Sequence, residues 1–386
     1  MKSQIKLWLF LFFALVTGGV ITSCSDDEEL ANGGKPMVSY VRVTRPEASD
    51  SLIVKASQGQ MIAIMGQNLG HAREVWINDQ PATLVPTFIT NTSIITRIPA
   101  LLPKEINNKM RIVFANGETL EHPFVLDVSE PVVSYMLSEY VATGSIATIR
   151  GNYFYAPVKV TFTGGVEGQI ETLADNMIQV KVPEGAQPGP ITVTTNFGAT
   201  ESEFWFRDNR NIILSFDNTT NGLWTGPANI KESDPAITPI NNKFLRMNQK
   251  LGEWGWYELY VGPTNSDVAL ETRNIPAEAF TNPKNYSLKF EINTLELFSG
   301  AQFLMHMGPG DMGSERGSAN YVWKPNIDTK GQWETVSIPW EEFWIANKRF
   351  AYTPTGYGVS FHFSGPNAFT GNFALDNVRV VPNVIP

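Results

Sequence analysis

The sequence predicts an all-β protein built from three sandwich domains. Glycine occurs 31 times and proline 25 times, and 11% of the residues are aromatic, which is the profile of many short strands joined by turns. Apolar and polar residues alternate in short segments, and no helical period of apolar residues runs for more than a turn or two. A length of 386 residues leaves room for two or three such domains.

The N-terminal segment has the order of an export signal. Lys2 and Lys6 precede an apolar run over residues 7–16, and this run is shorter than the ~20 apolar residues that span a bilayer. Residues 1–23 are therefore predicted to be a signal peptide. The next residue, Cys24, is the only cysteine of the chain, so no internal disulfide uses it. An exported cysteine without a possible partner needs another explanation.

The residues around this cysteine provide one. The sequence Ile21-Thr22-Ser23-Cys24 resembles the lipobox of bacterial lipoproteins, and the resemblance implies acylation of Cys24 and a lipid anchor in a membrane. Stable anchoring takes more than one acyl chain, which a triacylated cysteine supplies. The alternative is an ordinary signal peptide followed by a stray thiol.

An acidic tether over residues 24–36 is predicted to follow. Its run Asp26-Asp27-Glu28-Glu29 resembles the surface-export signal of lipoproteins in the Bacteroidota, which implies an outer-membrane protein that faces the cell exterior. The alternative is a merely solvated linker. The whole chain carries a formal net charge of −9, and this acidity argues against nucleic acid as a partner.

Residues 37–128 and 130–207 form an internal repeat. Each begins with a similar strand, Val38-Ser39-Tyr40 in the first and Val132-Val133-Ser134-Tyr135 in the second. Strands separated by turns then recur at the spacing of a small antiparallel sandwich. The segments IAIMGQNLGHAREVWINDQPA and ATIRGNYFYAPVKVTFTGG resemble the immunoglobulin-like IPT/TIG module. That resemblance implies two immunoglobulin-like β-sandwiches, which in tandem usually act as spacers.

Residues 210–386 differ in character, because seven of the ten tryptophans lie there. Their length and strand count suit a C-terminal jelly-roll β-sandwich. The segments ILSFDN, KGQWETVSIPWEEF and FALDNVRV resemble carbohydrate-binding jelly rolls. The whole layout resembles the surface glycan-binding proteins of gut Bacteroidota, of the SGBP-B type.

This resemblance implies a function and partners. It implies capture of a polysaccharide and favours a β-glucan such as xyloglucan, mixed-linkage glucan or β-1,3-glucan. It also implies two partners, an outer-membrane glycan transporter complex and a surface glycosidase. The rival hypotheses are a surface adhesin or structural lipoprotein and, as a third, a glycoside hydrolase.

A polysaccharide binder needs flat aromatic rings that meet the apolar faces of sugars. Trp224 lies in a glycine-rich loop, which is a poor place for a core residue. Residues 252–261 are predicted to be a strand that puts Trp254, Trp256, Glu258 and Tyr260 on one exposed face, although the opposite assignment is also open. Tyr321 and Trp323 are second-rank candidates, whereas Trp333, Phe343 and Trp344 are expected to pack structurally. The predicted glycan-binding residues are Trp224, Trp254, Trp256, Tyr257, Tyr321 and Trp323.

No catalysis and no required cofactor are expected. Glu253 and Glu258, the acids nearest to the tryptophans, are five residues apart and would point to opposite faces of a strand, whereas a glycosidase needs two facing carboxylates. The four histidines lie in separate segments without metal-ligand spacing. The jelly-roll resemblance implies one possible exception, a structural Ca²⁺ held by Asp217 and Asp376. Either carboxylate could instead bond backbone at a turn.

Overall fold

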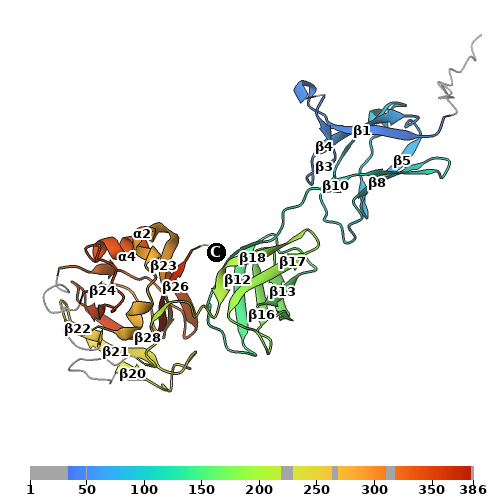
Figure 1. Ribbon diagram of the computed structural model, residues 1–386. Coiled ribbons are helices and arrows are strands. Elements are labelled where there is room, and N and C mark those ends of the chain that lie inside the picture. Colours follow the sequence, from blue (N-terminus) through green and yellow to red (C-terminus); the bar gives the residue numbers. More distant parts are fainter. Residues whose placement is uncertain (1–33, 49, 219–228, 263–267, 310–317, 384–386) are drawn as a thin grey trace, which may run out of the picture. The chain divides into compact units, whose positions relative to one another are not determined.

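The structure is a computed structural model, and the all-β prediction is confirmed (Figure 1). The chain divides into two compact units, Met1–Val128 and Ser129–Pro386. Within the described part of the chain, no helix is long and apolar enough to cross a membrane. The structure describes residues 34–48, 50–218, 229–262, 268–309 and 318–383.

The first unit is one β-sandwich. Its core lies between two four-stranded sheets, where alternate residues such as Ile62, Ile64, Val75 and Ile112 are buried. One sheet has the order β2 (Leu52–Ile53), β1 (Met37–Val43), β4 (Met61–Gln67) and β7 (Ser93–Arg97). The other sheet has the order β6 (Gln80–Ala82), β5 (Ala72–Ile77), β8 (Lys109–Phe114) and β9 (Thr119–Pro123). The short strands β3 (Lys55–Ala56) and β10 (Val125–Leu126) pair in parallel. Two short 3₁₀ turns, Pro46–Ala48 and Pro86–Phe88, complete it.

The second unit begins with a sandwich of the same kind, with its core between two four-stranded sheets. One has the order β11 (Val132–Met136), β12 (Ile146–Asn152), β16 (Met177–Lys181) and β15 (Gln169–Ala174), the other β14 (Val166–Glu167), β13 (Lys159–Phe162), β17 (Gly189–Thr195) and β18 (Gly198–Phe206).

The repeated glycines Gly66 and Gly151 have a physical reason. In each sandwich the first strand has an irregularity, and there its backbone passes close over a glycine of the strand it pairs with, β4 in the first sandwich and β12 in the second. A Cβ at Gly66 would collide with the carbonyl oxygen of Met37, and one at Gly151 with that of Val132. Only glycine permits this approach.

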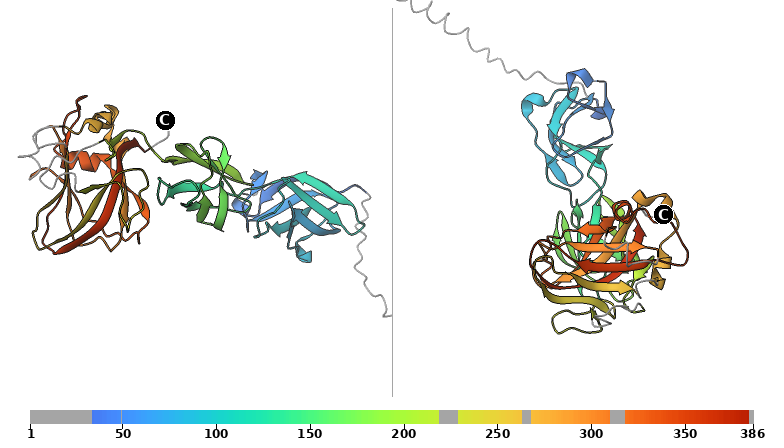
Figure 2. Two further views of the ribbon diagram at one scale, coloured as in Figure 1. Left: turned by 90° about the horizontal axis from the view of Figure 1, so that it is seen from below. Right: turned by 90° about the vertical axis from the view of Figure 1, so that its left-hand side faces the viewer.

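The C-terminal sandwich packs a larger sheet on a four-stranded one (Figure 2). The rings of Phe303 and Phe363 stack at 4.7 Å and those of Phe298 and Phe373 at 4.5 Å in the core between the sheets. The larger sheet has the order β20 (Ile230–Lys231), β21 (Phe244–Leu251), β28 (Phe369–Pro382), β23 (Tyr286–Thr294) and β26 (Trp333–Pro339), and β19 (Ile212–Leu214) also pairs with β28. The smaller sheet has the order β22 (Tyr257–Gly262), β27 (Gly358–Phe363), β24 (Phe303–Gly308) and β25 (Tyr321–Trp323).

Short helices lie at one end of this sandwich (Figure 1). Trp340 at the start of α4 (Trp340–Ala346) is fully buried, and its indole N–H donates to the carbonyl of Ala279 in α2 (Glu278–Thr281) at 2.9 Å. Phe343 is also buried and Trp344 packs against the core, in agreement with the structural role predicted for both. The remaining short turns are Leu270–Asn274 and Pro283–Asn285.

Buried charges join the two sandwiches of the second unit. Glu139, in the loop between β11 and β12, accepts hydrogen bonds from Arg379 and Lys289, both at 2.6 Å. Arg379 also bonds Glu291 at 2.9 Å. The backbone N–H of Thr335 donates to the carbonyl of Leu137 at 2.8 Å. The C-terminal sandwich therefore contacts the preceding one through specific and largely buried hydrogen bonds and ion pairs.

Candidate functional site

The smaller sheet of the C-terminal sandwich has one apolar and one polar face. In β27, Val359, Phe361 and Phe363 point into the core, so Ser360 and His362 project from the other face. His362 lies in register with Glu258 of β22 on one side and Leu304 of β24 on the other. The outer side of this sheet therefore carries Glu258, Ser360 and His362 beside the apolar Leu304, and Ser360 and His362 are themselves buried.

A tight turn leads into this sheet, and here the strand predicted over residues 252–261 is partly wrong. The strand β22 begins only at Tyr257. Before it, the N–H of Gly255 bonds the carbonyl of Gly252 at 3.0 Å, and Trp254 has a φ of 53°. That left-handed conformation is incompatible with a strand. The N–H of Trp254 donates to the carbonyl of Gly365 at 2.6 Å and so fixes the turn.

The turn presents two tryptophans to solvent. Trp254 is 67% exposed and Trp256 is 51% exposed. The ring of Trp256 lies on the imidazole of His362, with centroids 4.3 Å apart and an interplanar angle of 27°. Because His362 is fully buried, its imidazole packs firmly against one face of the Trp256 ring. About half of the Trp256 side chain remains exposed and can meet a ligand.

The predicted alternation along β22 is corrected by a bulge. The register shifts between Glu258 and Tyr260, and Tyr260 is fully buried instead of sharing an exposed face with the tryptophans. Tyr257 packs against the core, and its hydroxyl donates to Oδ1 of Asn229 at 2.8 Å. Burial raises the pKa of Tyr257. Its ring therefore does not join the exposed pair.

Tyr321 and Trp323 also turn toward the core. Trp323 meets Phe290 edge-on at 5.4 Å and Phe298 at 5.8 Å, and Tyr321 contacts Phe343 at 5.9 Å. Both rings are partly buried. The structure thus brings Trp254 and Trp256 together and separates them from the other predicted rings it describes. Trp224 and Cys24 lie outside the described residues.

Sequence reasoning missed His362. The four histidines lie in separate segments of the sequence, and that spacing gives no sign of a role for His362. The pattern that could have found it is the alternation Val359-Ser360-Phe361-His362-Phe363, in which the apolar residues predict a core face and leave the histidine on the opposite face. Nothing local, however, indicates that Trp256 would lie above it.

Asp217 and Asp376 do lie in neighbouring segments, because β19 pairs with β28. Asp217 accepts a hydrogen bond from the N–H of Lys243 at 2.8 Å. Asp376 is fully buried, and its Oδ2 has no hydrogen-bond partner within the described part of the chain. Burial, with the negative charges of Asp217 and Glu291, raises the pKa of Asp376 to about 9.

The donor set around these carboxylates is small. No group of three or more His, Cys, Asp or Glu side chains with metal-binding placement occurs among the residues that the structure describes. The orphaned oxygen of Asp376 fits a cation, but most of the six to eight oxygens that Ca²⁺ takes would have to come from backbone, amides or water.

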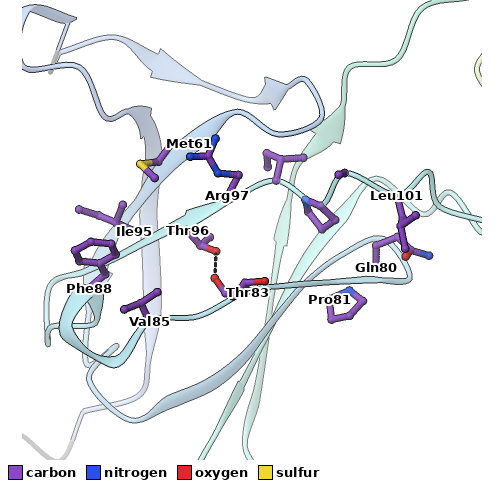
Figure 3. Close-up of a pocket in the computed structure, with 13 residues that line it drawn as sticks. Met61, Gln80, Pro81, Thr83, Val85, Phe88, Ile95, Thr96, Arg97 and Leu101 are labelled. Carbon is purple, nitrogen blue, oxygen red and sulfur yellow. Dashed lines mark hydrogen bonds between the residues drawn. The ribbon is translucent and has the colours of Figure 1, made fainter.

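A hollow in the first unit is a further concave feature (Figure 3). Its volume is about 450 Å³, and it opens beside the edge strands β6 and β7. The side chains of Val85, Phe88 and Leu101 are exposed along it. Its lining is mostly apolar, with few of the planar hydrogen-bonding groups that sugar hydroxyls require, so it does not suit a polysaccharide.

A jelly roll that presents exposed tryptophans beside a polar sheet face has the architecture of a carbohydrate-binding domain. Comparison with known families shows which domains these sandwiches are similar to. Residues 206–382 match the family described as "Surface glycan-binding protein B xyloglucan binding domain". Residues 51–122 match the IPT/TIG domain family. These matches confirm the resemblances drawn from the sequence for the first β-sandwich and for the C-terminal one.

Individual relatives agree with these families. An IPT/TIG domain-containing protein of Bacteroides ovatus is 30% identical over 153 residues, which are 38% of this chain and 31% of that protein. The chain thus matches about a third of this relative's length. The crystal structure of the surface glycan-binding protein PbSGBP-B from Prevotella bryantii is 22% identical and aligns with 91% of this chain and 99% of that chain, with a TM-score of 0.66. This similarity shows a common fold.

Proposed function

We propose that this protein is a non-catalytic, cell-surface lipoprotein that captures a β-glucan through Trp254 and Trp256. The observation that carries the proposal is the exposure of two neighbouring tryptophans, 67% and 51%, in a domain whose core already contains many other aromatic rings. An exposed tryptophan without a ligand is unfavourable in water, and clustered exposed rings mark binding surfaces. The family of residues 206–382 supports a glycan as the ligand.

The first candidate glycan is xyloglucan, because the description of the matching family specifies xyloglucan binding. Mixed-linkage glucan and β-1,3-glucan are the alternatives. Trp224 is proposed as a further ring of the site. The two exposed rings of Trp254 and Trp256 supply stacking surfaces for the sugar faces.

Anchoring and partners follow from the N-terminal residues. Acylated Cys24 would hold the protein in the outer membrane, and the tether of residues 24–36 would carry the β-sandwiches to the exterior. An outer-membrane glycan transporter complex and a surface glycosidase are the proposed partners. The role is to hold a long chain near the machinery that cuts and imports it.

A structural Ca²⁺ between Asp217 and Asp376 is part of the proposal. The buried, unpartnered Oδ2 of Asp376 supports it. A cation there would compensate two neighbouring carboxylates and, through β19 and β28, stabilise the start of the C-terminal sandwich.

The test is titration calorimetry of the full chain against xyloglucan, mixed-linkage glucan and β-1,3-glucan, with reducing sugar measured in the same samples. We expect heat of binding with at least one glucan and no release of reducing ends. Release of reducing ends would support the hydrolase hypothesis instead. Absence of binding to all three glucans would favour the adhesin hypothesis.

The matched variants are Trp254→Ala and Trp256→Ala, with Tyr135→Ala as control. Tyr135 is 53% exposed and lies in the preceding sandwich, outside the candidate site. Loss of affinity in the tryptophan variants, but not in the control, would locate the ligand at the turn. Equal affinity in all of them would reject this site.

A further inference from the structure

The contact between Trp256 and His362 has a consequence for how the site binds. Their rings are stacked with centroids 4.3 Å apart. We infer that His362 is a positioning residue, which holds the Trp256 ring in the plane on which the sugar stacks. The inference rests on the proposed function and names a residue on which that function depends.

The two rings differ in burial. His362 is fully buried, whereas Trp256 is 51% exposed. The imidazole therefore covers one side of the indole and leaves the other free. A ring held in one orientation before the ligand arrives loses less conformational entropy on binding than a ring that moves among rotamers.

The position of His362 is set by the sheet and not by the turn. It lies in the middle of three strands, opposite Glu258 and Leu304. The hydroxyl of Ser360 lies 3.5 Å from its Nδ1. The neighbouring residues Phe361 and Phe363 pack into the core, so the histidine cannot shift without moving β27. His362 is thus a rigid support for the ring of Trp256.

Trp256 itself has weaker local support. It precedes β22, whose pairing with β27 starts at Tyr257 opposite Phe363. Trp254 differs, because its own backbone N–H bonds Gly365 at 2.6 Å. Removal of the imidazole should therefore loosen the Trp256 ring and leave the backbone of Trp254 in place.

The test uses His362→Ala and His362→Phe in the full chain, with xyloglucan, mixed-linkage glucan and β-1,3-glucan as probes. Alanine removes the support, and we expect affinity to fall by about threefold to tenfold, the size of one aromatic pair contact. Phenylalanine restores a flat face of similar size, and we expect affinity within about twofold of the parent. His306→Ala is the matched control, because His306 is also buried, on the adjacent strand β24, and its Nδ1 bonds the carbonyl of Ala319. This control should lower the melting temperature without lowering affinity.

A double-mutant cycle separates positioning from general damage. If His362 acts through Trp256, His362→Ala should have no further effect on affinity in a Trp256→Ala background. An equal loss in both backgrounds, unchanged affinity after His362→Ala alone, or failure of phenylalanine to restore it would overturn the inference.

A measurement without glycan keeps the inference distinct from the proposed function. The heteronuclear ¹H–¹⁵N NOE of the Trp256 indole N–H should fall in His362→Ala and recover in His362→Phe. A parent protein that binds none of the glucans would reject the proposed function, whereas an unchanged NOE in His362→Ala would reject the positioning role. If His362→Ala is too unstable for calorimetry, the NOE still tests the positioning role, because His362→Phe keeps a ring in contact with Trp256 and should keep the NOE of the parent.

Discussion

The guanidinium of Arg379 lies 2.6 Å from a carboxylate oxygen of Glu139, although 240 residues separate them in the sequence. Arg379 is fully buried, and Glu291 bonds it from the other side at 2.9 Å. Burial opposes the charge on Arg379, but Glu291 and Glu139 together raise its pKa above the ordinary value. This ion pair connects the two sandwiches of the second unit.

Replacing Glu139 by alanine should destabilise the second unit. Removal of Glu139 leaves Lys289 without its carboxylate partner and leaves Arg379 with Glu291 alone. Breaking a buried ion pair in this way typically costs about 3–5 kcal/mol. Differential scanning calorimetry should show a lower melting temperature. Glu171→Ala, an exposed carboxylate on β15 of the same sandwich, is the control and should melt as the parent does. Equal melting of the parent and Glu139→Ala would mean that the joint contributes little to stability.

Separating the C-terminal sandwich from the preceding sandwich should also lower its melting temperature. A fragment of residues 129–386 keeps the joint, whereas residues 210–386 lose Glu139 and expose the buried face around Arg379. We expect the longer fragment to melt at the higher temperature and to bind glucan as the full chain does. Calorimetry of both fragments checks this. A shorter fragment that melts at the same temperature would show that the C-terminal sandwich folds independently.

Substitution of both Trp254 and Trp256 by alanine should abolish or strongly weaken glucan binding while the melting temperature changes little. Each lost platform should cost on the order of 1–3 kcal/mol of binding free energy, by analogy with bases that lose an aromatic stacking partner. Both rings are at least half exposed, so little fold stability depends on them. Trp340→Ala is the contrasting variant, because this ring is fully buried and its loss should cost about 3–5 kcal/mol of folding free energy. A collapse of melting temperature in the double variant would contradict the platform assignment.

Cys24→Ala should release the protein from the membrane. Lipid chains attached at this residue are the proposed anchor, and each buried CH₂ contributes about 0.8 kcal/mol to membrane binding. Fractionation and immunoblotting should find the variant in the soluble fraction and the parent in the outer membrane. Persistent membrane association of the variant would reject the lipid anchor at this position.

Removal of calcium should test the pair Asp217 and Asp376. We expect excess chelator to lower the melting temperature of the parent and added Ca²⁺ to restore it, since a ligand that binds only the folded state stabilises it. Asp376→Asn should abolish this calcium dependence. An identical melting curve with chelator and with Ca²⁺ would mean that no such cation is bound.

Much of the fold could be predicted from local patterns. Alternation and turn residues predict the strands, and the repeated glycines Gly66 and Gly151 reflect a contact that only glycine allows. The burial of Phe343 and the packing of Trp344 also agree with the prediction. Such features depend on residues close in sequence or on the period of a strand, so the amino-acid order is sufficient to find them.

The site needed the tertiary structure. Alternation puts Tyr321 and Trp323 on one face of a strand, but it does not say that this face is the core. Glycines on both sides of Trp254 permit a turn where alternation suggested a strand, and a bulge after Glu258 then sends Tyr260 inward.

The sequence by itself determined an all-β chain with repeated sandwiches and an aromatic-rich last domain, because strand period and turn chemistry are local. Only the tertiary structure decided that Trp256 rests on His362 and that Glu139 meets Arg379. Each of these pairs brings together residues more than 100 positions apart. Their contact depends on how strands are ordered in the sheets and how one sandwich packs on the next, and no local pattern encodes that order.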